Sequence, residues 1–365
     1  MSHTPTIAQR KEDHIEVNLT RPVTFDSVTT GLERYQFIHE ALPDMALGDI
    51  ELGTMFLGHA LGTPVFISSM TGGVQRGWEI TRRLARVAQA YQGAIGIGSQ
   101  RAALIDPALA TYFQVRDIAP DVVLLANLGA SHLATGHAVD QCRRAIDMIG
   151  ADALILHLNP LQEAIQREGE RDSTGILSAI EAVCRLVQVP VVVKEVGCGI
   201  SGVTARRLAD AGVAAIDASG AGGTSWSAVE GQRATTARGR RLGETFRDWG
   251  IPTALSLAMA REAVPGLPLI ASGGLRTGLD AAKVLALGAS LAGFAGAILR
   301  AAAGSEDAAF EEVGTIHDEL RIAMYCAGAR SIRDLDQSLL MDRGGAWVGV
   351  TGSRLGEEAP AHVLA

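Results

Sequence analysis

The segment PVVVKEV-GCGISG-VTARRLADAG-VAAID, residues 190–217, contains an apolar run, a glycine loop, a helical pattern and a second apolar run. Three glycines in the loop have the GxGxxG spacing of a dinucleotide-binding motif, and Asp217 follows them about twenty residues on, where that motif has its acid. Lys194 and Glu195, however, lie inside the first run, which stays apolar up to the glycines in a dinucleotide-binding unit. The segment also recurs in form along the chain, so we interpret it as one unit of a repeated β–α pattern.

Eight short apolar runs, each with polar or glycine residues at its end, are separated by helical patterns. These runs are PVFISSMTGG (64–73), GAIGIGSQR (93–101), VVLLANLG (122–129), ALILHLNP (153–160), PVVVKEV (190–196), AAIDASGAGGTSW (214–226), PLIASGG (268–274) and SLAGFAGA (290–297). Runs of this length between helices indicate buried parallel strands with helical crossovers. Eight such units predict a single (β/α)8 TIM barrel of class α/β, whose functional residues follow the carboxyl ends of the strands.

The barrel is expected to occupy residues 61–304 of the 365-residue chain. Residues 1–60 are interpreted as an N-terminal arm and a short strand–helix lead-in, and residues 305–365 as closing helices and a tail that frays from about Thr351. We find no linker or low-complexity tract that indicates a second domain.

The composition excludes several classes of protein. The net charge is −8 with no basic run, which argues against nucleic acid as a partner. The four cysteines have no CxxC spacing, which argues against zinc and against a disulfide framework. No run of eighteen apolar residues occurs and the start of the chain lacks a hydrophobic signal segment. We therefore expect a cytoplasmic protein without a membrane partner.

The last two strand ends are candidates for a phosphate site. Gly273 and Gly274 follow the seventh run, before a helix expected to begin near Leu279, and Ala295 and Gly296 follow the eighth. Bare backbone N–H groups beside a helix N-terminus bind anions, and phosphates bind after these two strands in many barrels. The alternative is that the glycines only permit tight turns.

Lys194 is one of three lysines in an arginine-rich chain, and it ends the fifth run. A cation there can stabilise the N1–C2=O region of a reduced flavin. A structural ion pair with Asp217 or Glu195 is the alternative, because a lone charge is costly to bury. Other strand ends supply hydroxyls, an amide and backbone groups for the polar edge of a flavin ring: Ser69, Met70, Thr71, Ser99, Asn127 and Thr224.

A series of motifs in order, over roughly residues 10 to 340, resembles the type 2 isopentenyl diphosphate isomerases, FMN-dependent enzymes with a (β/α)8 barrel. The motifs are RKxDH, SSMTGG, GSQRAAL, ANLGA, HLNxxQE, KEVGxGIS, GGTSW, DWGIPT and SGGLRTG. The resemblance implies that the chain interconverts isopentenyl diphosphate and dimethylallyl diphosphate. It also implies FMN, Mg²⁺, NADPH as the reductant of the flavin, and a homo-oligomer (tetramer or octamer).

The same resemblance implies residue roles. Ser69, Met70, Thr71, Ser99, Asn127, Lys194 and Thr224 would line the flavin, and Gly273, Gly274, Leu275, Ala295 and Gly296 would hold its phosphate. The substrate would be bound by Arg10, Lys11, Ser99, Gln100, Arg101, His157, Asn159 and Gln162. Gln162 would act at the allylic part of the substrate as the catalytic residue, and Glu163 would ligate Mg²⁺.

Two of these assignments have plain alternatives. Arg10–Lys11 alone would be a solvated charge pair, and an isolated His157 would be a satisfied core histidine. The chain also departs from the family pattern after Glu163, where Gln166-Arg167-Glu168-Gly169-Glu170 replaces a Gln-Pro-Glu-Gly-Asp loop, and at Cys198, where an aromatic residue is common. These departures concern substrate preference rather than reaction type.

The rival functions are a flavin oxidoreductase on the same barrel and a catalytically silent flavin-binding scaffold. A hydroxy-acid oxidase requires a base histidine after the sixth strand, which is absent here, and Cys198 lacks the glycine–serine setting of a nucleotide-dehydrogenase nucleophile. The silent scaffold would be favoured if Arg10, Lys11, Gln162 or Glu163 were missing, and all four are present.

Overall fold

Eight parallel strands form a closed barrel in the computed structural model, which describes residues 7–342. The strands follow one another around the barrel in chain order, and β11 pairs with β4 to close it. They are β4 (Val65–Ile67), β5 (Ala94–Gly96), β6 (Val123–Gly129), β7 (Ala153–His157), β8 (Val191–Lys194), β9 (Ala215–Asp217), β10 (Leu269–Ala271) and β11 (Leu291–Phe294). Each strand lies within one of the eight apolar runs, so the predicted barrel is confirmed.

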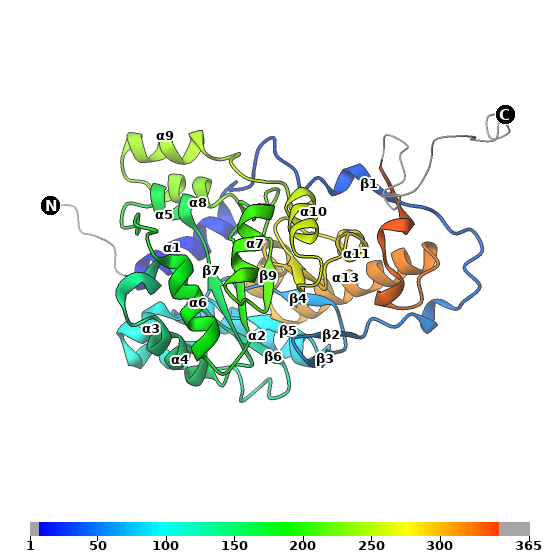
Figure 1. The fold of residues 1–365 in the computed structure, drawn as a ribbon, viewed down its shortest axis with the longest axis horizontal. Helices are drawn as coiled ribbons and strands as arrows, with labels where there is room; N and C mark the ends of the chain where they lie inside the picture. Colours follow the sequence, from blue (N-terminus) through cyan, green and yellow to red (C-terminus); the bar gives the residue numbers. More distant parts are fainter. Residues whose placement is uncertain (1–6, 343–365) are drawn as a thin grey trace.

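An outer layer of helices covers the barrel, with one or more helices after each strand (Figure 1). The helices that follow the strands are α2 (Gln75–Ala90), α3 (Arg101–Ile105), α4 (Ala138–Ile149), α5 (Pro160–Ile165), α6 (Ile176–Leu186), α7 (Gly202–Asp210), α8 (Trp226–Arg233), α9 (Ala237–Thr245), α10 (Thr253–Ala263), α11 (Gly278–Ala286), α12 (Gly296–Gly304) and α13 (Glu306–Cys326). Short 3-10 turns join them: η3 (Pro107–Phe113) and η4 (Ala130–Thr135). The glycine loop of residues 197–202 thus connects β8 to α7, as one β–α unit of the barrel.

The strand residues alternate between the barrel interior and the helix layer. In β8, Val192 packs in the interior cluster, whereas Val191 and Val193 pack in the cluster beneath the helices. Because the side-chain period of a strand is two, Lys194 points into the barrel. In every strand, the residue two positions after the last interior apolar residue also faces the interior, and it is polar or glycine. We call these eight residues the polar layer: Ser68, Gly96, Asn127, His157, Lys194, Asp217, Ser272 and Gly293.

A hairpin of β2 (Thr54–Phe56) and β3 (His59–Leu61) closes the other end of the barrel. Its Phe56 and Leu61 pack with the interior residues at the start of the strands. The turn needs a positive φ at Gly58 (85°), which glycine adopts without steric cost. With this end filled by apolar side chains, the polar layer and any ligand site belong to the carboxyl ends of the strands.

The N- and C-terminal segments meet outside the barrel. Before the barrel come α1 (Ile7–Thr20), η1 (Leu32–Arg34), β1 (Tyr35–Phe37) and η2 (Leu47–Asp49), and after α13 come η5 (Ile332–Asp334), η6 (Gln337–Leu339) and β12 (Leu340–Asp342). β1 pairs antiparallel with β12, and Arg34 forms an ion pair with Asp342. This pairing was not predicted from the sequence. The tail expected to fray from Thr351 lies outside the described residues.

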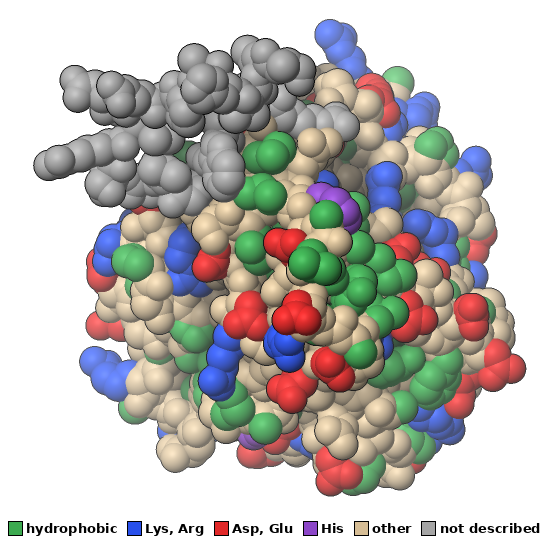
Figure 2. Space-filling view, turned by 90° about the vertical axis from the view of Figure 1, so that its right-hand side faces the viewer, with side chains coloured by type: hydrophobic (Ala, Val, Ile, Leu, Met, Phe, Trp, Pro, Cys, Tyr) green, Lys and Arg blue, Asp and Glu red, His purple; other side chains and the backbone are tan. Residues whose placement is uncertain are grey.

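Two surface properties bear on partners. No helix within residues 7–342 is both long enough and apolar enough to cross a membrane. Figure 2 shows the face of the molecule that lies on the right in Figure 1, beyond β1. Acidic and basic side chains are interspersed on this face, with apolar ones between them. The described part of that face therefore presents no continuous basic surface of the kind that binds nucleic acid.

His317 of α13 connects the closing helix to the bottom of the barrel. Its ring stacks on Tyr91 with centroids 4.2 Å apart, Nδ1 lies 2.7 Å from the Val313 carbonyl oxygen, and Nε2 lies 2.7 Å from Thr63 Oγ1. Burial lowers the pKa of His317 below its ordinary value. The folded state thus prefers the neutral ring, and its contribution is present above the unfolded pKa of about 6.5 and lost as the pH falls.

His317→Phe keeps an aromatic ring against Tyr91 and removes the titrating group. We expect the free energy of unfolding of the wild type to fall more steeply between pH 7 and pH 5 than that of His317→Phe. Denaturant titrations at four pH values in this range measure the difference. Parallel pH profiles for the two proteins would contradict this role of His317.

Candidate active site

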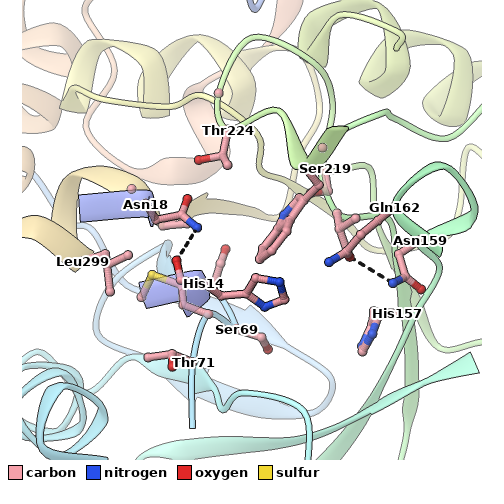
Figure 3. A pocket seen from close by; sticks show the side chains of 18 of the residues that line it. His14, Asn18, Ser69, Thr71, His157, Asn159, Gln162, Ser219, Thr224 and Leu299 are labelled. Carbon is pink, nitrogen blue, oxygen red and sulfur yellow. Dashed lines mark hydrogen bonds between the residues drawn. The ribbon is translucent and has the colours of Figure 1, made fainter. Parts of the chain in front are cut away.

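A cavity opens at the carboxyl ends of the barrel strands, and nearly all of the predicted site residues line it (Figure 3). The predicted residues in its lining are Arg10, Lys11, Ser69, Met70, Thr71, Ser99, Arg101, Asn127, His157, Asn159, Gln162, Glu163, Lys194, Thr224, Gly273, Gly274, Leu275, Ala295 and Gly296. The polar layer supplies its floor through Ser68, Asn127, His157, Lys194 and Ser272. One cavity therefore brings together residues from the N-terminal arm and from all eight β–α units.

Gln100 is the predicted residue that the cavity does not include. Its side chain is fully buried, with Nε2 donating to the Ala145 carbonyl oxygen at 2.8 Å and Oε1 accepting from the Asn127 N–H at 3.0 Å. These bonds tie the end of β5 to β6 and α4. The Gln100 side chain therefore lies in the wall behind the cavity, and its assignment as a substrate contact stays a prediction.

The glycine pair after β10 forms a cradle. Gly273 and Gly274 have φ values of 97° and 82°, a region that favours glycine. A Cβ atom at Gly273 would lie 2.1 Å from the carbonyl oxygen of Gly220, so a side chain is sterically excluded there. The cradle thus exposes backbone to the cavity on one side and packs against the β9 loop on the other.

Two helices begin near this cradle, α11 after Gly274 and α12 at Gly296, and they differ in how their N-termini are capped. In α11 the first N–H groups are already bound, since Gly278 donates to Glu319 Oε2 and Asp280 to Thr277 Oγ1. In α12 the capping residue Ala295 makes no side-chain bond to the helix, and Arg300 lines the cavity one turn later. A helix N-terminus without a side-chain cap and with a nearby guanidinium suits an anion better than the capped terminus of α11.

The middle of the cavity has polar atoms without partners. Ser68 Oγ and Ser69 Oγ are buried and have no hydrogen-bond partner within the described residues. Lys194 Nζ donates to the carbonyl oxygen of Glu195 at 2.8 Å. Among residues 7–342, no carboxylate oxygen lies within 4.0 Å of Lys194 Nζ. The alternative of a direct ion pair is therefore not observed. Hydroxyls and an ammonium facing the cavity fit the polar edge of a flavin, with its phosphate in the glycine cradle.

His157 is held as a neutral ring beside the polar layer. Its Nδ1 lies 2.8 Å from Asn127 Oδ1, and this amide oxygen accepts the Nδ1 proton. Burial, followed by the charge of Lys194, lowers the pKa of His157 to about 3. At neutral pH the Nε2 atom is consequently an acceptor, and His157 contributes to the cavity wall rather than to an apolar core.

The N-terminal helix α1 reaches over the strand ends and supplies cations. Lys11 Nζ donates to the carbonyl oxygens of Gly72 at 2.6 Å and Ser99 at 2.8 Å, and it lies above the Phe113 ring. Burial and the charge of Arg10 lower the pKa of Lys11 to about 7. The alternative of a solvated Arg10–Lys11 pair is wrong for Lys11, whose side chain closes the arm onto the barrel.

Arg101 at the start of α3 adds a third cation, and its partner, His132, was not predicted from the sequence. Arg101 NH1 donates to His132 Nε2 at 2.5 Å. Burial, then the charges of Arg101 and Arg10, lower the pKa of His132 to about 4, so the ring remains a neutral acceptor. His132 thereby orients the Arg101 guanidinium in the cavity wall.

Glu163 lies in α5 with a buried carboxylate. Its Oε1 accepts from Asn159 Nδ2 at 3.0 Å, and its Oε2 accepts from the Glu170 N–H at 2.7 Å. Nowhere in residues 7–342 do three or more His, Cys, Asp or Glu side chains gather as a metal site. A metal at Glu163 would therefore need oxygen ligands from a bound anion and water, which suits Mg²⁺.

A second buried carboxylate, Glu230 of α8, also escaped the sequence analysis. Its Oε1 accepts from Gln162 Nε2 and from His14 Nε2, each at 2.9 Å, and its Oε2 pairs with Arg233 NH1 at 2.5 Å. Burial opposes ionisation, but the His14 bond and the Arg233 charge keep the pKa of Glu230 below its usual range. Glu230 thus fixes the amide of Gln162 and connects it to the arm.

The chain is similar to known proteins both in family and in fold. The FMN-dependent dehydrogenase family matches residues 135–342. The isopentenyl-diphosphate delta-isomerase of Synechococcus sp. is 53% identical over 88% of this chain and 92% of its own. The enzyme of that name from Pseudescherichia vulneris is 50% identical over 91% of this chain and 96% of its own.

Solved structures of flavin enzymes have the same fold. A flavocytochrome b2 variant with sulfite bound superposes with a TM-score of 0.66 at 16% identity, over 95% of this chain and 86% of its own. A lactate oxidase of Pediococcus acidilactici gives 0.64 at 18% identity, over 93% of this chain and 96% of its own. At these identities the structures show the barrel fold alone, whereas the matches above show the family. The chain belongs to the type 2, FMN-dependent isopentenyl-diphosphate delta-isomerases.

Proposed function

We propose that the cavity interconverts isopentenyl diphosphate and dimethylallyl diphosphate, a transposition of the C=C bond by a 1,3-proton shift, with FMN bound across the barrel mouth. One observation carries this proposal. A single cavity is lined by the glycine cradle with the N-terminus of α12, by polar residues around Lys194, and by the cations Arg10, Lys11 and Arg101. The cradle would hold a cofactor phosphate, and the cations would hold a substrate diphosphate.

The diphosphate is proposed to bind at the cationic end, between α1 and the start of α3. Arg10, Lys11 and Arg101 line this part of the cavity, and Arg101 is already oriented by His132. A bound diphosphate would offer charged oxygens in place of the carbonyl oxygens that Lys11 now contacts, and charge-assisted bonds are the stronger ones. Ser99, His157 and Asn159 complete the lining there.

Mg²⁺ is proposed to bridge the diphosphate and Glu163. The carboxylate points into the cavity and is fixed by Asn159 and by the Glu170 N–H. With a single protein carboxylate, the remaining ligands would be phosphate oxygens and water, which is a common mode for this ion. The divalent charge would also offset part of the anionic charge that the arm encloses.

Gln162 is proposed as the catalytic residue at the allylic part of the substrate. Its amide Nε2 is held by the Glu230 carboxylate, and its Oε1 accepts from Asn159 Nδ2 at 3.0 Å. The hydrogen-bond chain His14–Glu230–Gln162 can therefore stabilise positive charge that develops on the substrate carbons and keep the reacting end oriented. When bound in its reduced form, FMN supplies the proton donor and acceptor that the strand ends themselves lack.

Three further properties are proposed for the enzyme. NADPH would serve only to reduce the flavin, because the isomerisation is redox neutral. A cytoplasmic location is supported by four free cysteines, since thiols stay reduced in that compartment. Assembly as a tetramer or octamer is proposed from the family resemblance, and light scattering of the purified protein tests it.

Anaerobic turnover in D₂O tests the function. Enzyme reduced once by light and supplied with isopentenyl diphosphate and Mg²⁺ should form many equivalents of dimethylallyl diphosphate that contain deuterium. The absorbance of the reduced flavin should persist throughout, because no net electron transfer occurs. Product in a 1:1 ratio with oxidised flavin would favour the oxidoreductase, and a complete lack of reaction with flavin bound would favour the silent scaffold.

A further inference from the structure

Three buried charged residues lie at the carboxyl ends of β8 and β9, beneath the proposed flavin position. Lys194 and Asp217 are register partners on these neighbouring parallel strands, and both belong to the inward-facing polar layer. Glu195 follows Lys194 in the chain. The exposed fractions of Lys194, Glu195 and Asp217 are 7%, 5% and 1%, so water screens none of these charges well.

The carboxylate of Glu195 is committed to the turn that follows β8. Its Oε2 accepts from three successive backbone N–H groups, those of Val196 at 2.6 Å, Gly197 at 2.7 Å and Cys198 at 2.5 Å. This bonding holds the glycine loop in place. The Glu195 side chain is therefore explained by the loop, and it is not the residue whose function is open.

Asp217 has a free oxygen. Its Oδ1 accepts from Ser272 Oγ at 2.7 Å and from the Ser219 N–H at 3.2 Å, whereas Oδ2 has no hydrogen-bond partner within the described residues. Leaving a buried carboxylate oxygen unpaired is costly, because the oxygen has lost its bonds to water and gained none in return. Asp217 lies beside Lys194, the cation of the polar layer. We therefore expect this costly carboxylate to act through Lys194.

We propose that Asp217 is a positioning residue for the cofactor, which keeps the Lys194 ammonium charged so that Lys194 can stabilise the anionic reduced flavin. This inference rests on the FMN placement proposed above. Asp217 acts at longer range than an ion pair, and it leaves the ammonium donors of Lys194 available to the cavity. Its neighbours Ser272 and Ser219, the latter visible in the cavity wall, hold the carboxylate in place (Figure 3).

Lys194 and Asp217 oppose each other's neutralisation. Burial lowers the pKa of Lys194 and raises the pKa of Asp217, and the attraction between the ammonium and the carboxylate opposes both shifts. The Glu195 charge also supports the ammonium. His157, its register partner on β7, stays neutral because burial lowers its pKa to about 3, so it adds no competing cation. The Glu195 carboxylate is bound by the turn after β8, so Asp217 is the carboxylate left to support the Lys194 ammonium. Without Asp217 the neutral amine of Lys194 would become favoured.

Asp217→Asn is the direct test, since it preserves shape and still accepts from Ser272 and Ser219. We expect the affinity of the protein for reduced FMN, relative to oxidised FMN, to fall at least tenfold. For a two-electron couple this ratio corresponds to a midpoint potential about 30 mV more negative. Potentiometric titration of the bound flavin at pH 7 measures it. A shift to a more positive potential would overturn the proposal, because it would mean that Asp217 acts on the flavin only by its own negative charge.

Lys194→Arg supplies the second arm, because a guanidinium stays charged without a counter-ion. In the Lys194→Arg background Asp217→Asn should no longer lower the potential, and an equal negative shift in both backgrounds would contradict action through Lys194. Asp210→Asn is the matched control: it makes the same charge change at the exposed end of α7, outside the cavity, so the affinity ratio should change less than threefold. A comparable loss in Asp210→Asn would mean that the effect follows the net charge of the protein and not the position of Asp217, which would overturn the proposal.

If Asp217→Asn does not retain FMN, Asp217→Glu gives the same test with the charge kept. The proposal then predicts a potential close to that of the wild type, and a tenfold loss in the affinity ratio would overturn it. Failure of the proposed function has a different signature. Wild-type protein that does not bind FMN would remove the proposed cofactor site itself, whereas bound FMN with an unaltered potential in Asp217→Asn would remove only the role of Asp217.

Discussion

Glu163→Gln is expected to lower kcat/KM by about 100-fold at moderate Mg²⁺ and to leave the spectrum of bound FMN unchanged. The substitution keeps the size of the side chain and its acceptor for Asn159, and it removes the charge that Mg²⁺ requires. Interactions with an ionised group of this kind contribute about 1.5–3 kcal/mol, or roughly 10- to 150-fold. Raising the Mg²⁺ concentration should restore part of the activity, since mass action offsets a weakened site.

Glu170→Gln is the matched control for this experiment. It makes the same charge change on the same loop, where the Glu170 side chain is exposed and only its N–H contacts Glu163. The Mg²⁺ dependence of Glu170→Gln should resemble that of the wild type. An unchanged Mg²⁺ titration in Glu163→Gln would place the metal elsewhere, and equal losses in both variants would indicate a general effect of loop charge.

The barrel could be predicted because each of its strands can be recognised from its own short stretch of sequence. Each strand is a short apolar run that ends in polar or glycine residues, and the period of two places Val192 and Lys194 on the same inward face. The β1–β12 pairing was not predictable, because it joins segments about 300 residues apart through three-residue strands. Such short strands have too little pattern to be recognised before their partner is known.

Cavity residues could be predicted where the residue type is unusual for its place in the sequence. They could not be predicted where the direction of the side chain decides whether it reaches the cavity. Lys194 stood out as a lysine in an apolar run. Gln100 shows the limit, since the SQR motif identifies the segment but does not indicate that the middle side chain turns into the wall. The choice between α11 and α12 as the anion terminus likewise depended on Thr277 and Glu319, whose capping bonds are visible only in the folded chain.

His14 and Glu230 were missed because each has an ordinary local setting. His14 lies in a polar helix of the arm, and Glu230 is an acid in the helical pattern of α8, which a reader of the sequence assigns to a solvated face. The fold brings them together over a separation of 216 residues. A usable signal was the position of Glu230 four residues after Trp226, which places a carboxylate on the same helix face as a large aromatic ring. Trp226 does pack edge-on against His14.

Because Glu230 is the acceptor that orients Gln162, we expect Glu230→Gln to lower kcat by roughly 10- to 150-fold, since hydrogen bonds to an ionised group contribute about 1.5–3 kcal/mol. The variant replaces a charged acceptor by an amide, which weakens the bonds from both Gln162 and His14 and leaves Arg233 with less compensation. The Michaelis constant should change little, because Glu230 contacts neither the phosphate cradle nor Lys11, and an interaction made only in the transition state lowers kcat and kcat/KM together.

Glu168→Gln is the matched control. Glu168 Oε1 lies 3.5 Å from Arg233 NH2, so Glu168 and Glu230 pair with the same guanidinium, but Glu168 makes no hydrogen bond to Gln162. Steady-state kinetics of both variants, with flavin content checked by absorbance, separate the alternatives. A loss confined to KM, or an equal loss of kcat in Glu168→Gln, would mean that the Arg233 ion-pair network holds the loop and that Glu230 has no part in orienting Gln162.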